Sequence, residues 1–523
     1  MRGAAATAPR QRGPQNGEQM TPSSTSRRAA RKPTQRLSTG VPGLDEILCG
    51  GLTAERIYLV EGSPGTGKTT LGLQFLLEGL AKGEAGLYIT LSETADELDA
   101  VAESHGWSID ELSIYELSDD HRLDPDTQQS ILHPSELELD ETSSEVMEQV
   151  DRINPARVVF DSLSEMRLLA QNPLRYRRQI LALKQFFSSR NCTVLLLDDK
   201  SHQADHHLHS IAHGVMSLEQ MPQEFGKERR RINIIKMRGI KFRGGYHDYL
   251  LDTGGLRVFP RLAAAEQDGE FVALAQSTGS AGFDALLGGG MVAGTNTLIM
   301  GPSGVGKTTV TVRCMLSALE RGEQAAFYLF DEGLGTFLAR STALGMDLRP
   351  HLDSGLLSLH HVDPAELSPG QFAQMVRDAI DAGARFVVID SLNAYLQAMP
   401  GEQYLVLQMH ELLSYLNQKG VTTALVLGEH GLVGTLERDV DLSFLSDSTV
   451  LLRYFEAAGR LRRAITVVKS RTASHALTIH EFLMHADGIE VGEPLEGFEG
   501  VLTGLPTYRG GTPMLAPVDD AQA

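Results

Sequence analysis

The stretch EGSPGTGKTT occupies residues 61–70, and a close copy, MGPSGVGKTT, occupies residues 300–309. Both fit G-x-x-x-x-G-K-[ST], in which backbone N–H groups surround phosphates, the lysine reaches the β- and γ-phosphate oxygens, and the hydroxyl ligates Mg²⁺. Each copy stands between an apolar run typical of a strand and a stretch typical of a helix. The pair predicts two sites for ATP and Mg²⁺. The expected phosphate-binding residues are Gly62, Ser63, Pro64, Gly65, Thr66, Gly67, Lys68, Thr69 and Thr70, and Gly301, Pro302, Ser303, Gly304, Val305, Gly306, Lys307, Thr308 and Thr309.

A longer duplication surrounds the two loops. STGVPGLDEILCGGL (residues 38–52) precedes the first loop and STGSAGFDALLGGGM (residues 277–291) precedes the second, with the offset that also separates Gly62 from Gly301. Both copies then alternate apolar runs with helical stretches, which is typical of parallel strands joined by helical crossovers. The repeat predicts an α/β fold of tandem P-loop NTPase domains, each a mainly parallel central sheet flanked by helices.

The domain boundaries follow from breaks in this pattern. We expect domains over residues 36–260 and 261–500, separated near the loose segment AAAEQDGE, and a C-terminal tail over 501–523. Residues 1–35 are rich in arginine, alanine, proline and serine without apolar periodicity, so a disordered basic tail is expected there. Such a tail is compatible with a solvated extension, a nucleic-acid contact or a transit peptide.

The overall composition restricts the function classes. The 523 residues carry a formal charge of −20, and no apolar run approaches the roughly 20 residues of a membrane span. The three cysteines, Cys49, Cys192 and Cys314, lack the spacing of a disulfide framework or zinc ribbon, which favours a reduced, cytoplasmic setting. The acidic body argues against nucleic acid as a partner, although KERRR (residues 227–231) is locally basic.

Acidic residues at the ends of later apolar runs complete the expected sites. Asp161 ends ARVVFD and Asp390 ends ARFVVID, the position at which a P-loop fold places the acid that holds Mg²⁺ with Thr69 or Thr308. Hydrolysis also needs a group that orients or deprotonates water. Glu93 in LSET and the pair Asp331 and Glu332 in FDEG are the candidates. Taken alone, strand-ending acids could equally be helix caps or solvated ends.

In this order the motifs resemble the KaiC family of RecA-type ATPases in its two-domain form, over about residues 38–508. The resemblance rests on STGVPGLDEIL followed by GGL, the two loops, FDS and IDS, KMRG followed by HD, and the closing GVLTGLPTY. It implies a hexamer of two stacked rings with ATP at the seams between subunits. It also implies that a neighbouring subunit supplies a lysine and an arginine to the γ-phosphate. The matching positions are Lys236 and Arg238 in KMRG and Lys469 and Arg471 in VKSR; without the resemblance they would read as solvated charges.

Two departures from the family pattern separate the domains. The family has two adjacent acids as its hydrolytic pair; the first domain has Ser92 then Glu93, whereas the second keeps Asp331 and Glu332. The clock protein of this family phosphorylates adjacent serine and threonine residues in its second domain. Here Ser443 matches the serine and Phe444 replaces the threonine, so the resemblance leaves autophosphorylation at Ser443 open.

The sequence is compatible with three functions. The first is an ATP-driven signalling oligomer, an ATPase with or without serine/threonine autokinase activity. The second is a DNA-acting RecA-like motor, and the third is a scaffold that uses ATP only to join subunits. The acidic balance favours the first. The histidine-rich SHQADHHLHSIAH (residues 201–213) lacks a complete metal shell and is interpreted as a surface loop.

Overall fold

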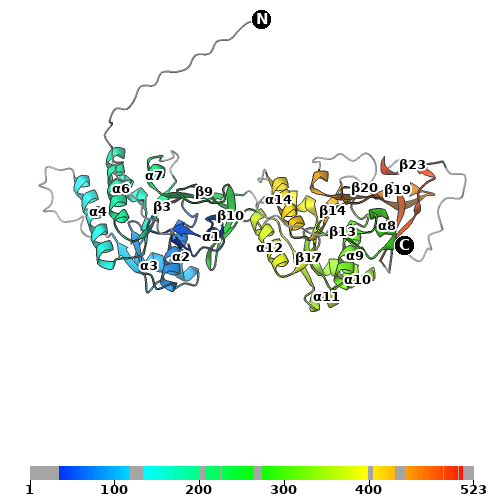
Figure 1. The fold of residues 1–523 in the computed structure, drawn as a ribbon, viewed down its shortest axis with the longest axis horizontal. Coiled ribbons are helices and arrows are strands. Elements are labelled where there is room, and N and C mark those ends of the chain that lie inside the picture. The colour runs from blue at the N-terminus through cyan, green and yellow to red at the C-terminus, as the bar shows by residue number, and fades with distance from the viewer. Residues whose placement is uncertain are drawn as a thin grey trace, which may run out of the picture.

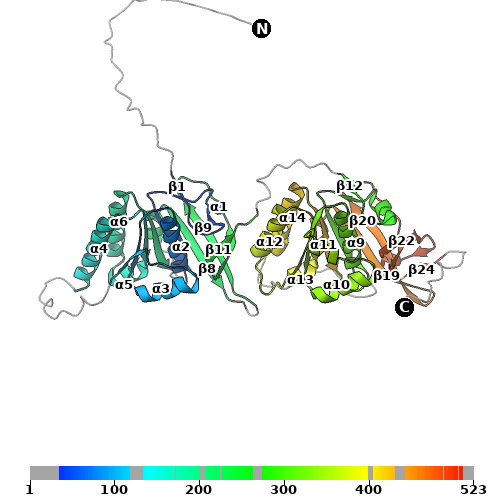
Figure 2. The same cartoon turned by 90° about the horizontal axis from the view of Figure 1, so that it is seen from below.

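The computed structural model describes residues 35–117, 134–170, 172–200, 206–223, 226–262, 274–397, 404–429, 442–486, 488–503 and 506–509. Figures 1 and 2 show two α/β units lying end to end. The expected basic tail and most of the expected C-terminal tail lie outside these residues. No helix among the described residues is long and apolar enough to cross a membrane.

The N-terminal sheet has nine strands in the order β11-β10-β9-β8-β3-β7-β6-β4-β5. Strands β8 through β5 in this order are parallel, and β9, β10 and β11 extend the sheet in antiparallel fashion. The strands are β3 (Ile57–Gly62), β4 (Gly86–Thr90), β5 (Ser113–Glu116), β6 (Arg157–Asp161), β7 (Thr193–Asp199), β8 (Gly214–Met221), β9 (Arg229–Met237), β10 (Tyr246–Asp252) and β11 (Gly255–Phe259). The helices are α1 (Leu44–Ile47), α2 (Lys68–Ala81), α3 (Ala95–Ser104), α4 (Pro134–Ile153), α5 (Leu163–Ala170), α6 (Pro173–Ser188) and α7 (His206–Ile211).

The C-terminal sheet repeats this topology, with the order β16-β15-β17-β18-β14-β19-β20-β21-β22. Its strands are β14 (Asn296–Gly301), β15 (Gln324–Leu329), β16 (Leu357–His361), β17 (Ala384–Asp390), β18 (Thr422–Gly428), β19 (Ser448–Ala457), β20 (Arg460–Ser470), β21 (His480–His485) and β22 (Gly488–Pro494). Its helices are α8 (Ala281–Leu287), α9 (Lys307–Glu320), α10 (Leu334–Ala343), α11 (Arg349–Asp353), α12 (Pro369–Asp381), α13 (Leu392–Gln397) and α14 (Leu405–Gln418), with short 3₁₀ turns η4 (Ser443–Leu445) and η5 (Val501–Thr503). The predicted tandem fold is confirmed.

Short ribbons complete each domain. They pair β1 (Arg36–Leu37) with β2 (Leu52–Thr53), β12 (Ala275–Gln276) with β13 (Met291–Val292), and β23 (Phe498–Glu499) with β24 (Thr507–Tyr508). The first two ribbons bracket the duplicated segments that precede the loops, so the sequence repeat corresponds to a repeated structural unit.

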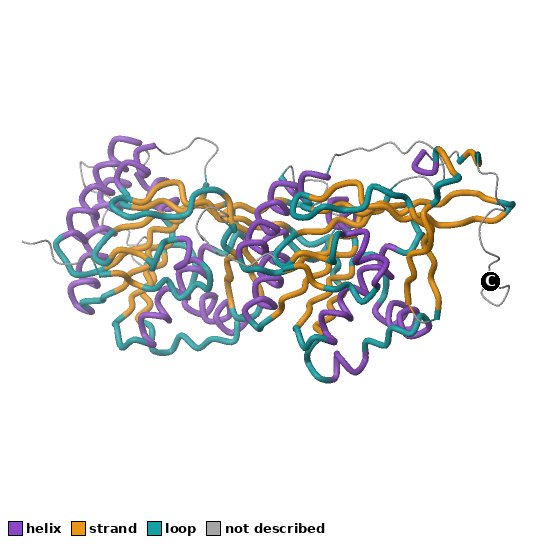
Figure 3. The backbone as a smooth tube through the Cα atoms, turned by 45° about the vertical axis from the view of Figure 1, so that its right-hand side comes forward, coloured by secondary structure: helices purple, strands orange, loops and turns teal. Residues whose placement is uncertain are grey.

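Burial on both faces explains why the central strands are nearly continuous apolar runs. Val158, Val159 and Phe160 of β6 are fully buried, and so are Val387 and Val388 of β17. Helices cover both faces of each sheet, as the purple segments around the orange strands in Figure 3 show. A polar side chain within such a strand would lose its water, so apolar residues occupy the run until it reaches the carboxyl edge.

The two domains also contact each other directly. Helix α12 of the second domain packs against β10 and β11 of the first. Gly370 N donates a 2.7 Å hydrogen bond to Asp248 Oδ2, and Arg229 donates from its guanidinium to Pro364 O at 2.9 Å. The boundary proposed at residues 260 and 261 falls just after β11, and the adjoining residues 263–273 lie outside the described residues.

Candidate nucleotide sites

Each glycine-rich loop joins the strand at the centre of its sheet to a long helix. The loops follow β3 and β14, and α2 and α9 begin at Lys68 and Lys307, so a helix N-terminus faces each loop. Gly67 and Gly306 precede these helices with φ of 88° and 111°, a region that favours glycine. A Cβ on Gly306 would also stand 2.8 Å from Met484 Sδ. Backbone N–H groups and the helix dipole therefore make both loops anion sites.

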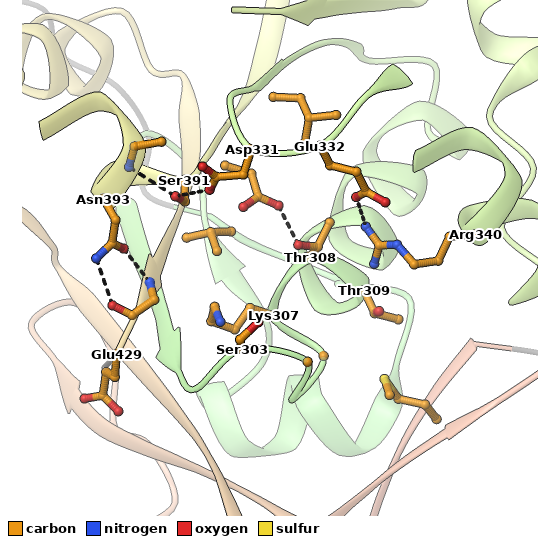
Figure 4. Close-up of a pocket in the computed structure, with 18 of the residues that line it drawn as sticks. Ser303, Lys307, Thr308, Thr309, Asp331, Glu332, Arg340, Ser391, Asn393 and Glu429 are labelled. Atoms are coloured by element: carbon orange, nitrogen blue, oxygen red, sulfur yellow. Dashed lines mark hydrogen bonds and ion pairs between the residues drawn. The ribbon is translucent and has the colours of Figure 1, made fainter. Parts of the chain in front are cut away.

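The C-terminal loop opens into a cavity of about 810 Å³. Its lining includes the loop, the ends of β15 and β17, and residues of α10 and α13. Figure 4 shows the predicted residues Lys307, Thr308, Asp331 and Glu332 around this cavity. Asp390 also lines it, so the structure brings together the C-terminal residues that were predicted from separate stretches of sequence.

Thr308 and Asp390 supply paired oxygen atoms at the base of this cavity. Thr308 Oγ1 donates to Asp390 Oδ2 at 2.6 Å. Burial raises the pKa of Asp390 to about 6, against the opposing effects of the Thr308 hydrogen bond and the Lys307 charge. Hydroxyl and carboxylate oxygens are the ligands that Mg²⁺ prefers, so this pair fits the ion that the sequence predicts.

Lys307 lies close to several acids without a direct ion pair to Asp390. Its Nζ donates to Pro302 O at 2.8 Å. Burial lowers the pKa of Lys307, whereas the charges of Asp390, Glu429 and Asp331 raise it. A phosphate group arriving beside this ammonium would add a further negative partner and favour its charged form.

The acid pair after β15 divides between two partners. Ser391 Oγ donates to Asp331 Oδ2 at 2.5 Å, and an Arg340 guanidinium nitrogen donates to Glu332 Oε2 at 2.6 Å. Ser391 follows Asp390 directly, so Asp331 is tied to the strand that carries the proposed metal acid, whereas Glu332 is tied to α10. The two acids are therefore not equivalent.

Further residues of this cavity were not predicted. Asn393 exchanges two hydrogen bonds with the backbone of Gly428, at 2.9 and 2.6 Å, which fixes α13 to the end of β18. Ser391, Arg340 and Glu429 were also missed. Serine directly after a strand-ending acid in both copies, FDS and IDS, was the one sequence signal for this group.

The N-terminal site keeps the same frame with different partners. Asp161 Oδ2 accepts from Thr69 Oγ1 at 3.2 Å and from the Tyr88 hydroxyl at 2.6 Å. Burial raises the pKa of Asp161. Lys68 Nζ contacts Asp199 Oδ1 at 2.9 Å and donates to Gly62 O at 2.9 Å. Asp199, unlike Asp161, was not among the predicted site residues.

Glu93 follows β4 near this site. Thr90 Oγ1 accepts from Glu93 N at 2.9 Å and donates to Glu93 O at 2.7 Å, which fixes the backbone. Burial raises the pKa of Glu93, and the Asp161 charge adds to the effect. Its neighbour Ser92 occupies the place that Asp331 has in the other domain.

The predicted basic pairs lie at the opposite end of their sheets from the loops of the same domain. Lys236 pairs in register with Val215, next to the Gly214–Tyr58 pair at the start of β3, and Lys469 pairs with Thr449 near the start of β14. Lys236 Nζ donates to His209 O and to Ala212 O, and Lys469 Nζ donates to Ser446 O at 2.7 Å.

The arginines of these pairs lie at the same edges. Arg238 donates from its guanidinium to Ser210 O at 2.7 Å, and Arg471 lies 3.8 Å from an Asp447 carboxylate oxygen. The structure therefore does not bring Lys236, Arg238, Lys469 or Arg471 to the loop of their own domain. Ser443 begins η4 at the same edge as Lys469.

The histidine-rich segment differs from its interpretation as a loop. The short helix α7 begins at His206 within it, and His209 Nε2 lies 2.8 Å from Glu61 Oε2, directly before the first loop. The interpretation was wrong for residues 206–211, because Glu61, a half-buried acceptor that a local pattern does not reveal, holds this part of the segment against the sheet. Residues 201–205 of the segment lie outside the described residues. No cluster of metal-ligating side chains occurs in the described parts of the chain.

Comparison with known proteins agrees with this architecture. A family model described as "ATPase: KaiC" matches residues 37–263 and 276–496. The chain is 25 % identical over 487 residues to the circadian clock protein KaiC3 of Synechocystis sp., covering 91 % of this chain and 95 % of that protein. It is 26 % identical over 501 residues to the circadian clock oscillator protein KaiC of Prochlorococcus marinus strain MIT 9313, covering 90 % and 95 %. The corresponding protein of Synechococcus elongatus is 25 % identical over 488 residues, covering 90 % and 92 %. With both of its domains matched, the chain belongs to the KaiC family of ATPases.

Proposed function

We propose that this chain hydrolyses ATP in both domains as a ring-shaped homo-oligomer, a hexamer in the family pattern, whose nucleotide state governs the binding of signalling partners. The observation that carries the oligomer is the separation of each loop from its expected basic residues. Lys469 and Arg471 lie at the amino end of β14, whereas the loop lies at its carboxyl end. These residues reach a γ-phosphate only when a neighbouring subunit contributes that edge.

In this mechanism the loop N–H groups and Lys307 bind the phosphates of ATP. Thr308 and Asp390 would hold Mg²⁺, which when bound offsets charge on the β- and γ-phosphate oxygens. Asp331, held by Ser391, orients water toward the γ-phosphorus. Lys469 and Arg471 from the neighbouring subunit stabilise the charge that develops on the phosphoryl oxygens. In the N-terminal site Lys68, Thr69 and Asp161 take the corresponding binding roles, with Lys236 and Arg238 supplied in the same way.

Autokinase activity at Ser443 is the finer part of the proposal. The η4 turn that begins at Ser443 lies at the edge that bears Lys469, away from the loop of its own domain, so transfer to this residue would come from the C-terminal site of a neighbour. The same assembly would therefore serve hydrolysis and phosphoryl transfer, with water and a serine hydroxyl as alternative acceptors.

The contacts of the basic run argue against the DNA-motor alternative. Arg229 donates to the second domain, Arg230 pairs with Glu228 at 2.9 Å, and Arg231 pairs with Glu219 at 3.5 Å. A run whose cations already have acidic or carbonyl partners offers little free positive charge to a phosphate backbone.

The test uses full-length protein with γ-labelled ATP and Mg²⁺, following free phosphate and protein-bound label together. Lys68→Ala and Lys307→Ala silence one loop each, and Ser443→Ala removes the proposed acceptor. We expect phosphate release that both lysine variants reduce, and label that is lost in Lys307→Ala and in Ser443→Ala. Mixing Lys307→Ala protein with Ser443→Ala protein would restore label only if transfer passes between subunits. Bound ATP without release or label would leave the scaffold function instead.

A further inference from the structure

The acidic residues near Lys68 and those near Lys307 follow different strands of their sheets. In the C-terminal site Asp331 follows β15, and Gly428 ends β18, the neighbour of the loop strand. In the N-terminal site Ser92 takes the place of Asp331, and Asp199 takes the place of Gly428. The sheet register fixes this second equivalence, because Gly62 pairs with Asp199 and Gly301 pairs with Gly428. One carboxylate is missing on one side of the N-terminal site and one is gained on the other.

Asp199 is aimed at the group that binds the γ-phosphate. Its Oδ1 lies 2.9 Å from Lys68 Nζ, and its side chain is 48 % exposed, so both water and nucleotide have access to it. Its backbone is fixed by a 3.2 Å hydrogen bond from Asp199 N to Ser164 Oγ, and by the pairing of β7 with β3. The lysine of such a loop contacts the β- and γ-phosphate oxygens. Asp199 contacts that lysine directly, so only the Lys68 side chain stands between Asp199 and the expected position of the phosphates.

We propose that Asp199 activates the attacking water in the N-terminal site, in the role that Asp331 has in the C-terminal site. This inference rests on the proposed ATPase function of the N-terminal domain. The water oxygen forms a bond to the γ-phosphorus while the bond from that phosphorus to the β–γ bridging oxygen breaks. One water proton passes to the Asp199 carboxylate and then to solvent, and ADP and phosphate leave.

Glu93 is the competing candidate for this role. Its counterpart in the second domain, Glu332, is bound by Arg340 of α10 at 2.6 Å rather than aimed at the loop lysine. Asp199, in contrast, contacts Lys68 directly. Glu93 itself forms no ion pair among the described residues, and its Oε2 is buried without a hydrogen-bond partner near Asp161 and Lys68. Both acids therefore border the phosphate site, and the direct contact with Lys68 is what favours Asp199.

The experiment isolates the N-terminal site in full-length Lys307→Ala protein and measures phosphate release with ATP and Mg²⁺, together with the affinity for a fluorescent ATP analogue. Asp199→Asn should lower kcat by on the order of 10²-fold or more, with analogue affinity unchanged or tighter because Lys68 loses its competing anion. Adding Ser92→Asp to Asp199→Asn should recover at least about tenfold of that kcat by returning a carboxylate to the β4 side. Asp99→Asn, at an exposed aspartate of α3, is the matched control.

The outcomes separate this inference from the proposed function. Unchanged kcat in Asp199→Asn, with or without tighter binding, would show that Asp199 is only a counter-ion of Lys68. A large loss in Glu93→Gln with none in Asp199→Asn would assign the role to Glu93 and overturn the inference. If Lys307→Ala protein releases no phosphate at all, hydrolysis by the N-terminal domain fails, and the inference fails with it.

Discussion

The two nucleotide sites share a backbone frame and differ in the side chains around it. Asp161 accepts from Thr69 and from Tyr88, whereas the register places Phe327, which has no hydroxyl, at the position of Tyr88. Glu61 directly precedes the first loop in the sequence and contacts His209, whereas Met300 directly precedes the second loop. Duplication has therefore preserved the phosphate cradle, which depends on glycines and strand ends, while the surrounding polar contacts have diverged.

Replacing Asp331 tests whether this acid is what distinguishes the two sites, and we expect it to have the largest effect. Asp331→Ser in a Lys68→Ala background copies the N-terminal arrangement into the C-terminal site. A positioned base contributes a factor of about 10² to 10⁴ to the rate of hydrolysis. We therefore expect the rate of phosphate release by the C-terminal site to decrease by a factor in that range while ATP remains bound. Phosphate release and nucleotide binding would be measured on the same sample.

Asp353→Asn, at an exposed residue of α11, serves as the control for this comparison. Unchanged release in Asp331→Ser would mean that Glu332, despite its ion pair with Arg340, carries the chemistry.

An ion pair at matching positions of the two domains has reversed polarity. Lys200 lies 2.8 Å from Glu219 in the N-terminal domain, and Glu429 lies 3.3 Å from Arg453 in the C-terminal domain. The positions match, because Lys200 N and Glu429 N both donate to the last residue of the loop strand. The side-chain exposures are 40 % and 23 % in the first pair but 5 % and 13 % in the second. Because the C-terminal pair is more buried, removing one of its partners should lower the free energy of unfolding more than removing a partner of the N-terminal pair.

Arg453→Ala should therefore lower the free energy of unfolding of the C-terminal domain by about 3–5 kcal/mol, because Glu429 would be left buried without its cation. Lys200→Ala should cost at most about 1 kcal/mol. Hydrogen exchange at β19 reports the C-terminal domain, and fluorescence of Trp107, the single tryptophan, reports the N-terminal domain.

The double variant Glu429→Gln/Arg453→Met removes both charges and should recover most of the loss. Equal effects of Arg453→Ala and Lys200→Ala would contradict the dependence on burial.

The sequence allowed the cradle to be predicted because its parts are local. Glycines, the lysine and the hydroxyl are contiguous, and the acids of β6 and β17 end recognisable apolar runs. The reversed ion pairs were not predictable in this way. Lys200 follows β7 and Glu219 lies on β8, and β3 separates these strands in the sheet. Which charges meet there depends on strand order, and no spacing in the chain encodes it.

The contribution of Asp199 was missed for a related reason. LLLDD (residues 195–199) ends in acids just as ARVVFD ends in one, but only the pairing of β7 with β3 brings Asp199 to Lys68. Contacts between the domains could not be predicted from the sequence either, because Asp248 on β10 contacts α12, which lies more than a hundred residues later in the chain.

His247 and His480 occupy matching register positions in the two sheets. His247 of β10 is buried, accepts from Arg261 N at 2.9 Å, and has a pKa that burial lowers to about 4. His480 of β21 is partly exposed and contacts Thr478 and Gly492 O. Because the folded-state pKa of His247 lies below the unfolded value of about 6.5, the unfolded state binds the extra proton first, and stability is lost as pH falls from about 6.5 to 4.

At pH 5 this linkage should cost the N-terminal domain about 2 kcal/mol relative to pH 7. His247→Gln should remove the share of the acid sensitivity that His247 contributes, while His213, whose pKa burial also lowers to about 4, should keep its own share. Urea unfolding followed by Trp107 fluorescence at both pH values gives the measurement. An equal pH dependence in wild type and His247→Gln would contradict the assignment.

The smallest expected effect concerns the join between the domains. The Asp248 carboxylate is partly buried and accepts from Gly370 N in the first turn of α12, so one domain adds an acceptor to the N-terminus of a helix whose own N-cap is Ser368. Its counterpart on β21, Glu481, instead pairs with Arg462 of its own domain at 2.7 Å. Removing a helix-capping acceptor costs typically about 1 kcal/mol.

Asp248→Ala should therefore speed hydrogen exchange in the first turn of α12 by roughly fivefold, the factor that 1 kcal/mol gives. Asp248→Asn keeps a side-chain oxygen and should retain most of the protection, while Glu481→Ala should leave α12 unaffected and loosen β20 and β21. If Glu481→Ala exposes α12 as much as Asp248→Ala does, the helix responds to general loss of stability and the cap is not what joins the domains. If only Asp248→Ala does so, the Asp248 carboxylate couples the sheet of one nucleotide site to the helix that leads into β17 and Asp390 of the other, alongside the Arg229–Pro364 contact.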